Sequence, residues 1–127
     1  MDTKSEDLAS YYAKKYPFTF VDDPSQSGEG LNNRYAAAWE LAGKAASLLK
    51  ENYGAKEVAV FGSLVDRSRF TRWSDVDLAA WGIPDHRFYA AVAAVTGISR
   101  DFKVDLVDAA DCKDSLRRAI ESEGIKI

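Results

Sequence analysis

Three aspartates occupy positions where carboxylates are unusual and where they could act together. Asp75 and Asp77 alternate with Val76 and Leu78, and Asp105 lies between two apolar residues in a second alternating segment. This alternation is the pattern of a strand with one apolar face, so the carboxylates project from the opposite face, with the Cα atoms of Asp75 and Asp77 roughly 6 to 7 Å apart. If the two strands are neighbours, three carboxylates converge.

Converging carboxylates need a cation. Two unit charges about 4 Å apart repel each other by about 4 kcal/mol at an effective dielectric constant of 20. Hard oxygen ligands with no histidine or cysteine nearby favour Mg²⁺ or Mn²⁺ over zinc, and they leave coordination positions for phosphate oxygens and water. The pattern therefore indicates phosphoryl-type chemistry. The alternative is that Asp75 and Asp77 line a solvated face of the sheet and that Asp105 is an exposed edge residue.

A glycine and a serine precede these acids at a position suited to phosphate. Gly62 and Ser63 come directly after the apolar run EVAVFG. Glycine permits close approach, and backbone N–H groups with a small hydroxyl at a turn can cradle a phosphate. Arg67, Arg69 and Arg72 follow within six residues and would place positive charge beside it. For the arginines, a solvated loop face is the alternative.

The elements that must position these residues follow from periodicity and breakers. We predict helices over residues 4–16, 34–53, 84–96 and 111–122, strands over 57–62, 74–82 and 102–109, and a possible short edge strand over 125–127. Residues 17–33 are expected to form a loop, so that residues 1–33 are an N-terminal helix and loop arm and residues 34–127 are the main domain. The order indicates an α/β (α+β) fold, a small mixed β-sheet with helices on one face and the carboxylates on the other.

Composition narrows the class of protein. The chain has 127 residues, 46% of them apolar, and a net charge of −3, which is typical of one compact domain. Its apolar runs are too short for a membrane helix and its N-terminus is polar, so we expect a cytoplasmic protein. A single cysteine, Cys112, excludes an internal disulfide. The negative net charge argues against broad nucleic-acid binding.

Other chemistry-bearing residues are weaker candidates. His86 is predicted to be an exposed residue in the first turn of a helix, and Cys112 a packing residue. Trp73 and Trp81 are predicted to pack in the core, with stacking on a nucleobase as the alternative for Trp73. Asp108 is predicted to form a helix-capping pair with Asp111.

The segments VFGSLVDRSRFTRWSDVDLAAWG (residues 60–82) and VDLVD (104–108) together resemble the polymerase-β-type nucleotidyltransferase superfamily. In particular they resemble the minimal nucleotidyltransferase (MNT) antitoxins that pair with HEPN-type toxins. The resemblance covers residues 34–127 and implies a polymerase-β-like nucleotidyltransferase core. It also implies site residues: Gly62 and Ser63 bind the nucleotide; Asp75 and Asp77 bridge two Mg²⁺ ions, with Mn²⁺ as a possible substitute; and Asp105 binds the catalytic ion and helps to activate the acceptor hydroxyl. Arg67 and Arg69 are predicted to bind the nucleotide as well, because they, or Arg72, could replace a phosphate-binding arginine of the family.

The resemblance implies transfer of AMP from ATP to a hydroxyl of a partner, a HEPN-type RNase toxin that completes the site because this small chain has no acceptor domain. Homo-oligomers are also possible. The chain departs from the family where Asp66 stands in place of an arginine that contacts phosphate. That departure keeps open an antitoxin that acts by binding alone with a weak or vestigial site. A small-molecule or RNA nucleotidyltransferase is a further alternative.

Overall fold

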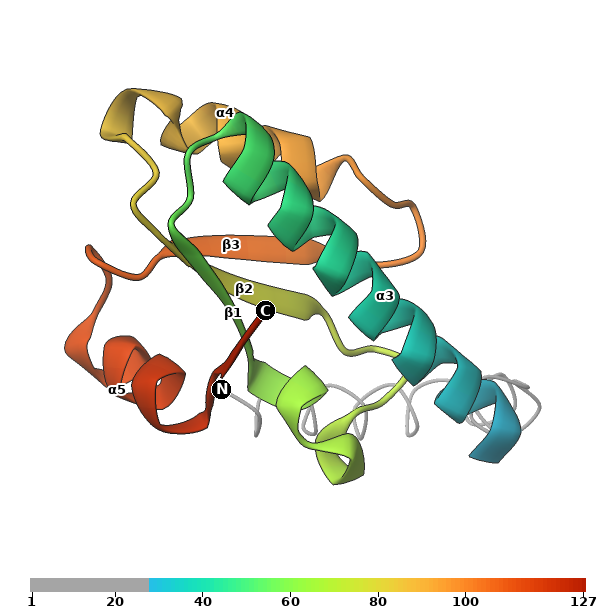
Figure 1. Ribbon diagram of the computed structural model, residues 1–127. Helices are drawn as coiled ribbons and strands as arrows, with labels where there is room; N and C mark the ends of the chain where they lie inside the picture. The colour runs from blue at the N-terminus through green and yellow to red at the C-terminus, as the bar shows by residue number, and fades with distance from the viewer. Residues whose placement is uncertain (1–27) are drawn as a thin grey trace.

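The computed structural model describes residues 28–127, whose elements follow the predicted order (Figure 1). These elements are α3 (Gly28–Asn52), β1 (Glu57–Phe61), the short 3-10 helices η2 (Gly62–Val65) and η3 (Arg67–Arg69), β2 (Val76–Trp81), α4 (Asp85–Thr96), β3 (Val104–Asp108), α5 (Asp114–Glu123) and β4 (Ile125–Lys126). The helix predicted over residues 4–16 lies outside the described residues.

Within residues 28–127 the strands form a single mixed sheet in the order β3-β2-β1-β4. β1 pairs antiparallel with both β2 and β4, and β2 pairs parallel with β3. The connection from β2 to β3 passes through α4, as a parallel pair requires. The predicted mixed sheet is confirmed, and the possible edge strand near the C-terminus is confirmed as β4.

The main core lies between one face of the sheet and the helices α3 and α4. α3 contributes the predicted apolar stripe, in which Ala38, Leu41, Ala42, Ala45 and Leu49 are buried and Leu48 is partly buried. The sheet contributes the residues that alternate with the aspartates, including Val76, Leu78, Val104 and Leu106. Figure 1 shows α3 crossing the sheet with α4 beside it. The helices predicted on one face are therefore confirmed for α3 and α4.

The last helix, α5, adds a smaller cluster on the other face, so the expectation that the helices share one face is wrong for α5. Ile120 of α5 is buried with Phe61, Ala79 and Ala109. Residue Phe61 is the register partner of Asp77 on the adjacent strand, so α5 covers the part of this face next to the aspartates. α5 therefore borders the aspartates on this face of the sheet.

Two helix boundaries differ from the prediction. α3 begins at Gly28, so the loop predicted over 17–33 is wrong for residues 28–33, which are helical. Leu31 and Tyr35 pack against the core, and this tertiary contact overrides the low helix propensity of the neighbouring Gly and Asn residues.

The helix predicted from residue 111 begins instead at Asp114. The Asp108 carboxylate accepts a hydrogen bond from the backbone N–H of Ala110 at 3.0 Å, and the Asp111 N–H donates to the Asp108 carbonyl at 3.1 Å. Asp108 and Asp111 therefore shape a turn before α5, and the predicted capping pair is wrong. Within residues 28–127, no helix is long and apolar enough to cross a membrane.

Candidate active site

Two of the three predicted acids are direct neighbours in the sheet. Asp77 of β2 and Asp105 of β3 are Cα partners in the parallel register. Their apolar neighbours Val76 and Val104 are buried on the opposite face, which fixes the direction in which both carboxylates point. Adjacent strands lie about 4.8 Å apart, so the two side chains share one short stretch of the sheet surface.

Asp75 lies two residues before Asp77 in the sequence. It directly precedes β2, and the backbone N–H of Val76 donates to the Lys103 carbonyl at 2.9 Å, so the hydrogen-bonded ladder continues beyond the first residues of β2 and β3. The ammonium of Lys103 lies 3.7 Å from Oδ1 of Asp105. In the described part of the chain, no three acidic, histidine or cysteine side chains are arranged to hold a metal ion as they stand. The structure thus pairs Asp77 with Asp105 and places Asp75 against the neighbouring basic pocket.

Gly62 lies against the Asp77 carboxylate. Its φ of +77° belongs to the left-handed region, and a Cβ built on it would lie 3.3 Å from Cγ of Asp77 and closer still to Oδ2. Both features require glycine, because an L side chain would be strained there and would collide with the carboxylate. The backbone of Gly62 and the carboxylate of Asp77 are consequently in close contact.

Ser63 adds an unsatisfied hydroxyl at the same turn. The side chain is 1% exposed, and its Oγ has no hydrogen-bond partner within the described structure. A buried hydroxyl without a partner is costly, and such groups mark places where a ligand or water completes the bonding. Ser63 therefore has spare hydrogen-bonding capacity, and the role of Gly62 and Ser63 in nucleotide binding stays a prediction.

The loop after Ser63 is tied to α3. The Tyr35 hydroxyl donates to the Leu64 carbonyl at 2.9 Å, and the Tyr35 ring meets Phe70 edge to face at 5.0 Å. The Arg67 guanidinium lies 5.3 Å from the Tyr35 ring centroid and donates to Oδ1 of Asn32, with 3.1 Å from Nε. The contacts described for Arg67 thus face α3, and its predicted role in nucleotide binding stays a prediction.

Asp66, which departs from the family pattern, has a structural role. Its Oδ1 accepts hydrogen bonds from Oγ of Ser68 at 2.6 Å and from the Ser68 N–H at 3.0 Å, and its Oδ2 lies 3.3 Å from Nε of Arg69. The hydrogen bonds from Ser68, with a smaller contribution from Arg69, lower the pKa of this carboxyl. Asp66 therefore caps η3 and orients Arg69.

A basic pocket of about 530 Å³ opens beside Asp75. Its cations are Arg34, Arg72, Arg100 and Lys103, its carboxylates are Asp75 and Asp101, and Trp73 forms part of the wall. The Arg72 guanidinium lies 4.5 Å from the Trp73 ring centroid. The core clusters do not include Trp73, so the expected core position is wrong for Trp73, whereas Trp81 packs against the smaller core cluster as predicted.

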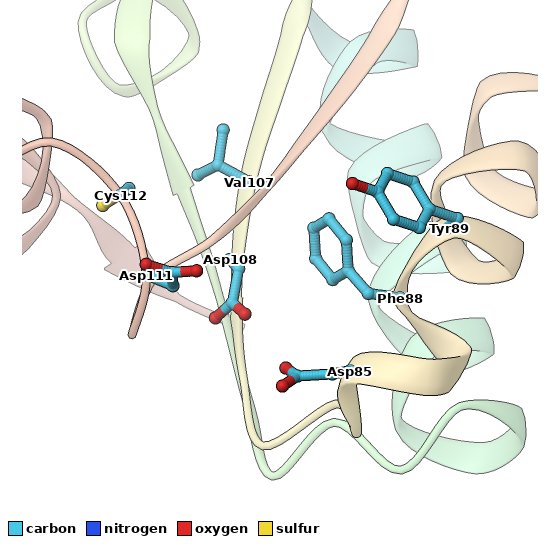
Figure 2. Close-up of a pocket in the computed structure, with 7 residues that line it drawn as sticks. All are labelled: Asp85, Phe88, Tyr89, Val107, Asp108, Asp111 and Cys112. Carbon is cyan, nitrogen blue, oxygen red and sulfur yellow. The ribbon is translucent and has the colours of Figure 1, made fainter.

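A second pocket, of about 400 Å³, lies at the other end of β3 (Figure 2). The carboxylates of Asp85 and Asp108 face each other across it, and Phe88 and Tyr89 of α4 form one side. Cys112 lines it and packs against the smaller core cluster, as predicted for a packing residue. His86 is exposed in the first turn of α4, also as predicted. This pocket gathers none of the predicted site residues.

Sequence reasoning missed the cations Arg34, Arg100 and Lys103. Arg34 lies near the N-terminal end of α3, far in sequence from the aspartates, so only the tertiary fold could place it beside Asp75. Arg100 and Lys103 flank Asp101 directly before β3, and their positive charges next to an acid-bearing strand were a usable signal.

The mixed sheet, with α3 and α4 on one face and the paired Asp77 and Asp105 on the other, gives the chain a fold that is similar to those of solved toxin–antitoxin structures. No protein-family model matches the sequence, and no curated protein matches it.

Among solved structures, the chain matches "Crystal structure the toxin-antitoxin MntA-HepT" at 20% identity and a TM-score of 0.52, over 69% of each chain. It also matches a crystal structure of the toxin–antitoxin with AMP-PNP, at 21% identity and a TM-score of 0.55, over 67% of this chain and 70% of that one. A mutant of this toxin–antitoxin matches at 22% identity and a TM-score of 0.54. At these identities, the likeness shows a shared fold.

Proposed function

We propose that the protein is a magnesium-dependent nucleotidyltransferase that transfers AMP from ATP to a hydroxyl of a partner protein, and that it thereby acts as the antitoxin of a HEPN-type RNase toxin. One observation carries the proposal. The neighbouring carboxylates of Asp77 and Asp105 lie beside a glycine turn whose backbone touches Asp77.

The donor set fits a divalent cation. Asp75, Asp77 and Asp105 supply hard oxygen ligands, and Asp77 and Asp105 are register partners on adjacent strands. Mg²⁺ bound there would neutralise phosphate charge and polarise the reacting oxygens. The unsatisfied Ser63 hydroxyl and the turn at Gly62 would bind the triphosphate on the β1 side of Asp77.

Asp105 lies on the β3 side of Asp77, away from Gly62, and we assign the incoming acceptor to that side. The acceptor hydroxyl oxygen forms a bond to the α-phosphorus, the bond from the α-phosphorus to the pyrophosphate oxygen breaks, and the hydroxyl proton passes to the Asp105 carboxylate. Pyrophosphate leaves with the electron pair of the broken bond. Catalysis of this kind depends mainly on positioning and charge stabilisation.

We expect the partner protein to supply the acceptor hydroxyl, because the sheet, its helices and the turn at Gly62 account for the metal and nucleotide positions of the proposed site. The structural matches, which include a toxin–antitoxin complex and a form with AMP-PNP, support a protein partner and an adenine nucleotide. The protein encoded next to this chain in its genome is therefore the first acceptor to test.

The test incubates the protein with radiolabelled ATP, Mg²⁺ and that neighbouring protein. We expect label on the neighbour with the wild type and none with Asp75→Ala plus Asp77→Ala. A matched control, Asp85→Ala plus Asp111→Ala, removes two carboxylates from the pocket at the other end of β3 and should leave transfer intact. Neutralisation of the toxin that survives the Asp75 and Asp77 substitutions would refute the enzymatic proposal.

The second candidate is an antitoxin that acts by binding alone. Two observations favour it. Asp66 stands where the resemblance expects an arginine, and its carboxylate accepts a hydrogen bond from Ser68, so this position offers no cation to a phosphate. The Asp105 carboxylate lies 3.7 Å from the Lys103 ammonium. This candidate predicts that toxin neutralisation needs neither ATP nor Mg²⁺, which the same assay measures directly.

A further inference from the structure

The basic pocket beside Asp75 has an excess of positive charge. Arg34, Arg72, Arg100 and Lys103 outnumber the two carboxylates that line it. It borders the strand positions two residues before Asp77 and Asp105, and that step is about 7 Å along a strand. A group bound in the pocket would therefore lie within one side-chain length of the paired aspartates.

Two guanidinium groups in this pocket are held in fixed planes. Arg34 lies 4.1 Å from the Phe102 ring centroid and donates to the Asp101 carbonyl at 2.8 Å. Arg72 lies over the Trp73 ring. Stacked guanidinium groups lose little freedom when they bind a planar anion, and their fork of N–H donors matches a carboxylate.

The basic pocket lies on the β3 side of Asp77. Gly62 and Ser63 adjoin Asp77 from the β1 side, whereas Arg100 and Lys103 directly precede β3. The proposed triphosphate position and the basic pocket are therefore on opposite sides of Asp77, and the pocket is on the side from which an acceptor would approach Asp105. This step rests on the proposed function.

We infer that the basic pocket is an acceptor subsite that binds an acidic segment of the partner protein, next to the hydroxyl that receives AMP. A protein segment fits better than a nucleic acid, because the cations form one compact pocket of about 530 Å³, which suits one or two side chains. A nucleic acid backbone is bound along an extended basic track, and the chain as a whole has a net charge of −3.

The experiment measures binding of fluorescein-labelled peptides by anisotropy, without ATP or Mg²⁺. Each peptide carries one central tyrosine flanked by aspartates, by asparagines or by lysines. We expect the aspartate peptide to bind about tenfold more tightly than the asparagine peptide, because charge-assisted hydrogen bonds are lost in the latter. Arg72→Glu and Arg100→Glu should each abolish this preference. Arg118→Glu, which changes an exposed arginine of α5, is the matched control and should retain it.

Melting curves establish that each variant is folded. Equal binding of the three peptides, or a preference that survives Arg72→Glu combined with Arg100→Glu, would overturn the proposal. The proposal would also be overturned if an oligoadenylate of equal charge bound more tightly than the aspartate peptide and if Arg72→Glu and Arg100→Glu removed that tighter binding. This result would assign the pocket to nucleic acid. Because the assay contains no ATP, a peptide preference without label transfer would refute only the proposed enzymatic function.

Discussion

Asp77 and Asp105 face the same side of the sheet as register partners on parallel strands. Such a pair of carboxylates is unfavourable unless a cation lies between or beside them. The 3.7 Å contact of Lys103 with Asp105 offsets part of this repulsion, but it comes from an exposed side chain and is weak.

Replacement of Asp77 by asparagine should separate stability from activity. Asp77→Asn removes one negative charge from the pair, so the melting temperature without metal should stay equal or rise, while AMP transfer falls about 100-fold or more. Mg²⁺ should raise the melting temperature of the wild type and not of the variant. Asp111→Asn, in an exposed turn, serves as the control. An unchanged response to Mg²⁺ in Asp77→Asn would show that Asp77 is not a ligand.

Gly62→Ala should damage both the fold and the site. The positive φ of Gly62 and the proximity of the Asp77 carboxylate predict a loss of about 1–3 kcal/mol in the free energy of unfolding, measured in urea. Gly43→Ala is the matched control, because a Cβ at Gly43, which is exposed on α3, meets no atom within 4 Å. That substitution should stabilise the helix by about 0.5–1 kcal/mol. Equal effects of the two substitutions would contradict the close approach.

Ser63→Ala should leave stability intact and weaken nucleotide binding. The Ser63 Oγ is buried without a partner, so its removal costs the folded chain no hydrogen bond. We expect unchanged or slightly higher stability, together with about tenfold weaker binding of ATP measured by calorimetry with Mg²⁺ present. A clear loss of stability with normal ATP affinity would instead assign the hydroxyl to the fold.

Asp66 should make stability depend on pH in the acid range. Because its folded pKa is lowered by the Ser68 hydrogen bonds, the charged carboxylate stabilises the folded state at pH values above the ordinary carboxyl pKa, which is near 4. This contribution is lost as the pH falls through the lower, folded pKa. The advantage of the wild type over Asp66→Asn in urea unfolding should therefore be present at pH 6 and disappear in strong acid. An advantage that is independent of pH would contradict this role.

The fold could be predicted largely from periodicity. The spacing of apolar residues in α3 and their alternation around Asp77 and Asp105 correctly predicted which side chains are buried. The start of α3 could not be predicted, because Leu31 and Tyr35 are recruited by contacts distant in sequence. Among the site residues, the pairing of Asp77 with Asp105 follows from strand alternation once the two strands are neighbours. The position of Arg34 beside Asp75 could not be predicted, because it depends on how α3 crosses the sheet.

The parallel pairing of β2 with β3 also sets the order in which the site is built during folding. β1 ends at Phe61 and β2 begins at Val76, so the contact of Gly62 with Asp77 closes a shorter loop than the pairing of Asp77 with Asp105 does. Asp105 reaches Asp77 only after α4 has crossed over and docked, which closes a longer loop at greater entropic cost. The proposed nucleotide side of the site is thus expected to form early and the proposed acceptor side late, so a partly folded chain would hold the turn at Gly62 without the completed pair of carboxylates.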